Sequence, residues 1–86
     1  MKSEEQFDQE LDQILLQLDQ GSSDMKQSAQ KIRLARQISG VAGEIWGETY
    51  LALKIAEDNS RSNPTLQKRI HELADTVERV LNRYRH

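Results

Sequence analysis

The sequence contains no cysteine, and this absence excludes several kinds of chemistry at once. Disulfide bonds, thiolate zinc sites, iron–sulfur clusters and cysteine nucleophiles all require the thiol group. Proline occurs once and glycine four times in 86 residues. With so few chain breakers and a clear hydrophobic periodicity, the sequence predicts an ordered helical chain and not a disordered one.

Long apolar runs are absent as well. No stretch approaches the roughly 20 residues that a membrane-spanning helix needs, and residues 1–10 lack the basic-then-apolar order of a signal peptide. The sequence therefore predicts a soluble, cytoplasmic protein without membrane association. A chain of 86 residues forms one domain, expected over 1–86, and buries only roughly 60% of its unfolded surface. A partner subunit is accordingly expected to contribute to stability.

The two ends of the chain carry helical apolar patterns. Residues 3–19 repeat large apolar side chains at intervals of four and three, and residues 64–85 do so over three heptads, which is typical of a coiled-coil helix. Asn63 can cap the second of these helices, with Pro64 at its first position. The two apolar stripes consist of Phe7, Leu11, Ile14, Leu15 and Leu18 near the start, and of Leu66, Ile70, Leu73, Val77, Val80 and Tyr84 near the end.

The middle of the chain predicts one long helix over 24–57. The apolar phase set by Ile32 and Ala35 continues through Leu53 and Ala56, and an interior glycine costs a helix only about 1 kcal/mol relative to alanine. A bend or break at Gly40–Gly43 is the alternative. The fold class expected is therefore all-α, with a long central helix and two shorter helices antiparallel to it.

Charge and length together suggest how these helices assemble. Acidic residues predominate in 1–20 and 41–60, and basic residues predominate in 21–40 and 61–86. This alternation favours segments that fold back on one another. Helix 3–19 is expected on the first half of the central helix and helix 64–85 on its second half, which leaves one side of the apolar stripes open. A homodimer that completes the bundle is predicted to cover it.

A row of small residues and the single tryptophan mark the expected contact surface. Small side chains spaced four apart let another backbone come close, and Trp46 beside them can fill the resulting hollow. A hinge or a ligand groove are the alternatives for this row. The predicted interface comprises Ala35, Ser39, Gly43, Trp46, Gly47 and Tyr50, together with Leu66, Ile70, Leu73, Val77, Val80 and Tyr84 of the last helix.

These patterns predict a non-enzymatic protein–protein interaction module: a small dimeric adaptor, assembly factor or regulatory subunit. A DNA-binding regulator with a degenerate helix-turn-helix over 32–53 is the alternative, although Glu44 and Glu48 would face the phosphates and nucleic acid is not the expected partner. A third hypothesis places a metal between Glu44 and Glu48 or at His71 with Asp75, but further ligands are lacking. No catalytic residue, metal or other cofactor is predicted.

Overall fold

The described part of the chain folds into four helices. The computed structural model describes residues 4–37 and 42–84, with α1 over Glu4–Asp19, α2 over Ser23–Gln37, α3 over Ala42–Asn59 and α4 over Pro64–Tyr84. No strand occurs among these residues. The all-α prediction is confirmed. None of the described helices is both long and apolar enough to cross a membrane.

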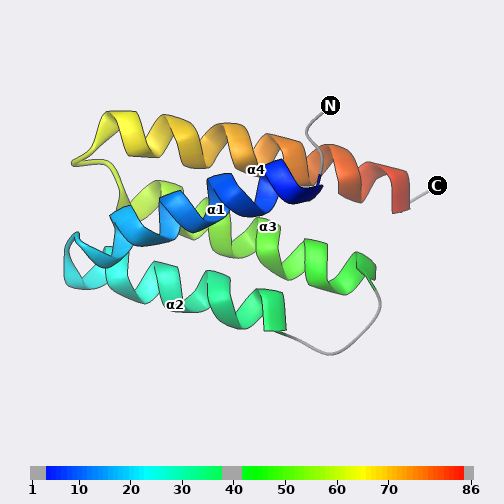
Figure 1. Cartoon of the computed structure of the whole chain (residues 1–86), viewed down its shortest axis with the longest axis horizontal. Helices are drawn as coiled ribbons and strands as arrows, with labels where there is room; N and C mark the ends of the chain where they lie inside the picture. The colour runs from blue at the N-terminus through cyan, green and yellow to red at the C-terminus, as the bar shows by residue number, and fades with distance from the viewer. Residues whose placement is uncertain (1–3, 38–41, 85–86) are drawn as a thin grey trace.

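The helices run alternately up and down, so that neighbours along the chain are antiparallel (Figure 1). α2 lies between α1 and α3, and α4 lies against α3 and returns to α1, whereas the backbones of the diagonal pairs do not approach each other. This is the arrangement of an antiparallel four-helix bundle with short connections. It confirms that the first helix packs on the basic segment and the last helix on the segment before it.

The prediction of one long central helix over 24–57 is wrong. α2 ends at Gln37 and α3 begins at Ala42, and the two helices lie side by side in opposite directions (Figure 1). The physical reason is that Ile32 and Leu53 can then bury their side chains in the same core, where both are fully buried. The break alternative is the one the fold adopts, so there are four helices and not three. The predicted completion of the bundle by a second copy is not confirmed.

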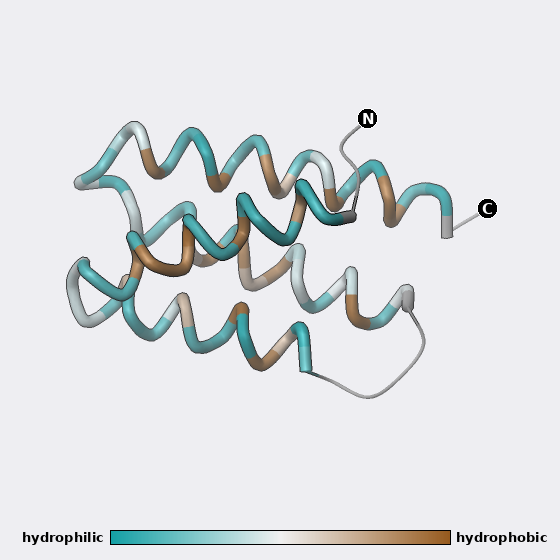
Figure 2. Tube along the Cα trace, viewed as in Figure 1, coloured by the Kyte–Doolittle hydropathy of each residue, from teal (hydrophilic) through white to brown (hydrophobic). Residues whose placement is uncertain are grey.

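The core lies between all four helices, and the predicted stripes of α1 and α4 supply most of its volume. On α4 the hydrophobic bands face the other helices (Figure 2). α2 and α3 approach each other more closely than α1 approaches either neighbour, because their facing positions are small residues. Buried in the core are Phe7, Leu11, Ile14, Leu15 and Leu18 of α1, Leu66, Ile70, Leu73, Ala74, Val77 and Leu81 of α4, and the small residues Ser28, Ala29, Ala35, Ala52 and Ala56 of α2 and α3.

Capping residues fix where the helices begin. The Asn63 side-chain oxygen accepts a hydrogen bond from the Leu66 amide at 3.1 Å, and Pro64 is the first residue of α4, as predicted. α2 is capped by Ser22, whose hydroxyl accepts from the Met25 amide at 3.3 Å. Ser23 and Asp24, which follow it, belong to residue types that cap helices equally well, so sequence alone does not choose among the three positions.

Gly21 lies two residues past the end of α1, and a side chain at this position would crowd Met25. No described glycine has a positive φ, so the left-handed cap that a glycine at this position suggests is not formed. A Cβ built on Gly21 would lie 2.5 Å from the sulfur and 3.0 Å from the Cβ of Met25. The connection between α1 and α2 is therefore tight because Met25 packs directly over the glycine.

Alanine substitutions at two glycines are expected to act in opposite directions. Gly21→Ala forces the flexible end of the Met25 side chain to move and should lower the free energy of unfolding by up to about 1 kcal/mol, at the low end of the cost of overpacking. Gly47→Ala, where a Cβ meets nothing within 4 Å, should raise it by up to about 1 kcal/mol through helix propensity. Urea unfolding of the two variants measures both effects. Equal destabilisation by the two substitutions would contradict the described packing.

Candidate protein-docking surface

An apolar groove runs between α2 and α3 on the outside of the bundle. Its volume is about 310 Å³, and Leu34 and Ala35 of α2 and Leu51, Ala52 and Ile55 of α3 line it. The three large side chains are exposed, with 63% of Leu34, 56% of Leu51 and 42% of Ile55 accessible to solvent. We call these five residues and the charged pair at its edges, Lys31 and Glu48, the α2–α3 groove.

Helix phase explains why the groove is open and apolar. Leu53 and Ala56 turn one face of α3 into the core, and Leu51 and Ile55 then lie one turn apart on the flank of the helix. The buried alanines Ala35 and Ala52 fill little of the space between the two helices. The groove therefore has a shallow floor of small residues and walls of leucine and isoleucine.

The two charged residues of the groove form no ion pair with another described residue. Lys31 on α2 and Glu48 on α3 are both exposed, and neither forms an ion pair or a hydrogen bond with another described residue. The groove thus carries one free cation on one helix and one free anion on the other. Both charges can reach a molecule bound over the apolar strip, because long side chains extend beyond the helix surface.

The two arginines of α2 are engaged with α1. The guanidinium of Arg33 donates to both carboxylate oxygens of Asp19, at 3.1 and 2.6 Å, and Arg36 donates to Asp8 at 2.9 Å. The hydrogen bond from Arg33 holds the pKa of the Asp19 carboxyl below its usual value, with a smaller opposing effect of desolvation. These pairs match the acidic and basic blocks of the sequence and orient α1 on α2.

Acid should remove the contribution of the Asp19–Arg33 pair. Because the folded-state pKa of Asp19 is lowered, the stabilisation is present above the unfolded pKa, near 3.8, and is lost as pH falls through the lower folded-state pKa. Asp19→Asn is therefore expected to be less stable than the wild type near neutral pH and equally stable in strong acid. Urea unfolding across this pH range measures the difference in the free energy of unfolding between the two proteins. Glu72→Gln is the control, because the exposed Glu72 side chain forms no ion pair with another described residue. A difference that does not change with pH would contradict the assignment.

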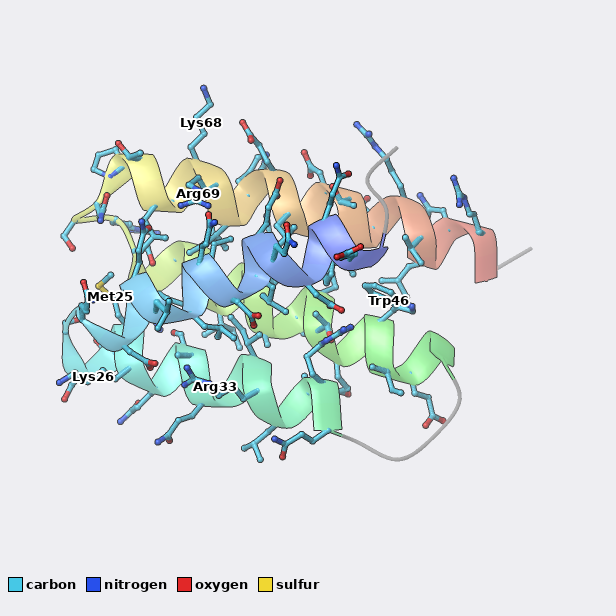
Figure 3. The ribbon with its side chains drawn as sticks, viewed as in Figure 1. Met25, Lys26, Arg33, Trp46, Lys68 and Arg69 are labelled. Atoms are coloured by element: carbon cyan, nitrogen blue, oxygen red, sulfur yellow. The ribbon has the colours of Figure 1, made fainter. Side chains whose placement is uncertain are left out.

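Trp46 joins an aromatic and cationic cluster at the end of the bundle where α1 begins (Figure 3). Its ring meets the Phe7 ring edge-on, with the centroids 5.2 Å apart and the planes at 71°. The Arg36 guanidinium lies 5.3 Å from the Trp46 ring and 5.5 Å from the Phe7 ring. Trp46 is partly buried, and its ring contacts Phe7 of α1 and Arg36 of α2.

The residues predicted for an interface fall into separate places. Ala35 lies in the floor of the α2–α3 groove, Gly43 and Gly47 are partly exposed, and the hydroxyl of Tyr50 donates to Glu78 of α4 at 3.4 Å. Ser39 lies outside the described residues, as does the side chain of Tyr84. A contact of the whole set with another molecule stays a prediction. Of the α4 set, Leu66, Ile70, Leu73 and Val77 are buried in the core of this chain, and Val80 is partly exposed.

The alternative sites receive no support from the geometry. The Nδ1 of His71 lies 3.0 Å from a Glu57 carboxylate oxygen and its Nε2 lies 3.5 Å from Asp75, yet no group of three potential ligands among the described residues could hold a metal ion. Glu44 and Glu48 are both exposed. α2 and α3 are antiparallel neighbours, whereas the helices of a helix-turn-helix cross at roughly 90–120°.

Sequence analysis missed the walls of the groove. Leu34, Leu51 and Ile55 lie off the stripe that runs through Ile32 and Leu53, and they are not part of the row of small residues. The signal in the sequence that could have identified the groove is the presence of large apolar residues outside the stripe. Leu51 and Ile55 are spaced four apart, as residues on one helix face are.

The fold and the groove together define a small antiparallel four-helix bundle with an exposed apolar face. Comparisons of the chain with models of protein families, with curated protein sequences and with solved structures found no match.

Proposed function

We propose that this chain is a non-enzymatic protein–protein interaction module, a cytoplasmic adaptor, assembly factor or regulatory subunit, that docks through the α2–α3 groove. The observation that carries the proposal is the exposure of Leu34, Leu51 and Ile55 on one face. Isolated exposed leucines are ordinary, but several that line one groove mark an interaction surface. Covering them contributes about 25 cal/mol per Å² of apolar surface removed from water.

The composition of the groove suits a docking surface. Its centre is apolar and its edges carry charges, which is the arrangement of protein–protein interfaces, with a desolvated core and a polar rim. The small floor residues Ala35 and Ala52 leave room for a side chain from the bound molecule. No observation on the structure favours DNA binding or metal binding in the same way.

The proposal is tested with a variant of the groove and a matched control. Leu34→Gln combined with Leu51→Gln changes the face, and Leu16→Gln changes a leucine that is 61% exposed on α1, outside the groove. All three positions are exposed, so both variants should fold. The full chain is cross-linked in its native cell, and the cross-linked partners are identified by mass spectrometry. We expect these partners to be lost from the groove variant and retained by Leu16→Gln. Cross-linked partners that persist in the groove variant would contradict the proposal.

A further inference from the structure

We infer that the occupant of the α2–α3 groove is a second copy of this chain, bound about a twofold axis so that Lys31 of each copy faces Glu48 of the other. This inference rests on the proposed docking surface and adds the identity of the partner. It is carried by the charges at the edges of the groove and by the shape of the face.

The charges make the face complementary to itself. Lys31 lies one turn before Leu34 on α2 and Glu48 one turn before Leu51 on α3, so in these antiparallel helices (Figure 1) the two charges lie at opposite ends of the apolar strip. Both are exposed and unpaired among the described residues. Consider a twofold axis that lies in the contact plane, passes midway between Lys31 and Glu48 and is perpendicular to the line that joins them. Rotation about this axis places Lys31 of one copy over Glu48 of the other, and Glu48 over Lys31. In such a contact every pair occurs twice. A partner with charge of one sign would satisfy only one of these charges.

The two arginines of α2 do not compete for this role. Arg33 and Arg36 are held by Asp19 and Asp8 of α1, and their guanidinium groups are therefore directed away from the groove. Among the described residues, Lys31 and Glu48 are the charged residues that line the groove, and Glu44, one turn before Glu48, adds a further exposed carboxylate on the α3 side. The pairing between copies is therefore assigned to Lys31 and Glu48.

The size of the face sets the expected strength of the contact. With 15 residues in α2 and 18 in α3, the longer helix measures roughly 27 Å at 1.5 Å per residue, and two helices side by side are roughly 20 Å wide. Such a face is smaller than the roughly 800 Å² that each partner buries in a standard interface. The dimer should therefore dissociate in the micromolar range, where both the apolar strip and the charges affect its affinity.

Charge reversal tests the arrangement directly. Lys31→Glu places two acidic residues on the face and Glu48→Lys two basic ones, so each variant alone should dimerise roughly tenfold more weakly than the wild type, because two attractive pairs become repulsive. An equimolar mixture of the two variants restores opposite charges at both contacts and should dimerise about as tightly as the wild type. Sedimentation equilibrium across micromolar concentrations measures all three affinities.

Controls separate the possible outcomes. Lys68→Glu reverses an exposed lysine of α4 that points away from the bundle (Figure 3) and should leave dimerisation unchanged. High salt should reduce the differences among the variants. A wild-type chain that remains monomeric, or a mixture that associates no better than either variant alone, would overturn the inference. If the chain is monomeric and the groove variant still loses its cross-linked partners, the docking surface stands and only the second copy is wrong.

Discussion

Leu53→Ala is expected to lower the free energy of unfolding by about 2–5 kcal/mol, the range for truncating a buried leucine. Leu53 is fully buried on α3, the helix that packs closely against both α2 and α4. The total stability of a chain of 86 residues is on the order of 4–13 kcal/mol. Removal of this one side chain should therefore take away a large share of the stability, with a cavity left between three helices.

The same substitution two residues earlier provides the matched control. Leu51 lies on the same helix but is 56% exposed in the groove, so Leu51→Ala should change the stability of the monomer by no more than about 0.5 kcal/mol. It should instead weaken self-association. Urea unfolding at low protein concentration, paired with sedimentation at higher concentration, separates the two effects. A Leu51→Ala variant that unfolds as readily as Leu53→Ala would contradict the orientation of α3.

Phe7→Ala is expected to have an effect of comparable size, a loss of about 3–5 kcal/mol in the free energy of unfolding. The Phe7 side chain is only 3% exposed and contacts both the Trp46 ring and the Arg36 guanidinium. These contacts connect α1 with the end of α2 and the start of α3. Without the phenyl ring, α1 should be held chiefly by its remaining apolar residues and by its ion pairs with α2.

Leucine at the same position isolates the aromatic contribution. Phe7→Leu keeps most of the buried apolar volume and should cost less than alanine, the ring-to-ring contact itself contributing about 0.5–1.5 kcal/mol. Trp46 is the only tryptophan, so its fluorescence reports on this cluster, and its emission should shift to longer wavelength in Phe7→Ala as water reaches the ring. Unchanged emission with nearly unchanged stability would show that Trp46 does not depend on Phe7.

Periodicity was sufficient to predict α1 and α4. Their stripes contain large apolar residues at intervals of three and four, and the helices begin and end within one residue of the predicted bounds. The prediction for the central segment failed because the phase of an apolar pattern gives only the angle at which a residue lies around a helix. Ile32 and Leu53 share a phase whether the chain continues straight or turns back, so phase cannot detect the break between Gln37 and Ala42.

The contact surface was harder to predict than the fold. A buried apolar side chain shows the same pattern whether its neighbour belongs to the same chain or to another, and Leu66 and Ile70 are buried by their own chain. The groove depends instead on how α2 and α3 are placed side by side. This pairing requires α2 and α3 to be two separate helices. A sequence interpreted as one long helix therefore does not identify Leu34 and Leu51 as neighbours in a groove.

The central claim is that the α2–α3 groove is the surface on which the chain binds another molecule of its own kind. Amide NMR spectra of the wild-type protein, recorded from micromolar to millimolar concentration, test it residue by residue. The signals that shift with concentration should cluster at the groove, at and beside Lys31, Leu34, Glu48, Leu51 and Ile55. Shifts confined to α1 and α4, or spectra that do not change with concentration, would contradict it.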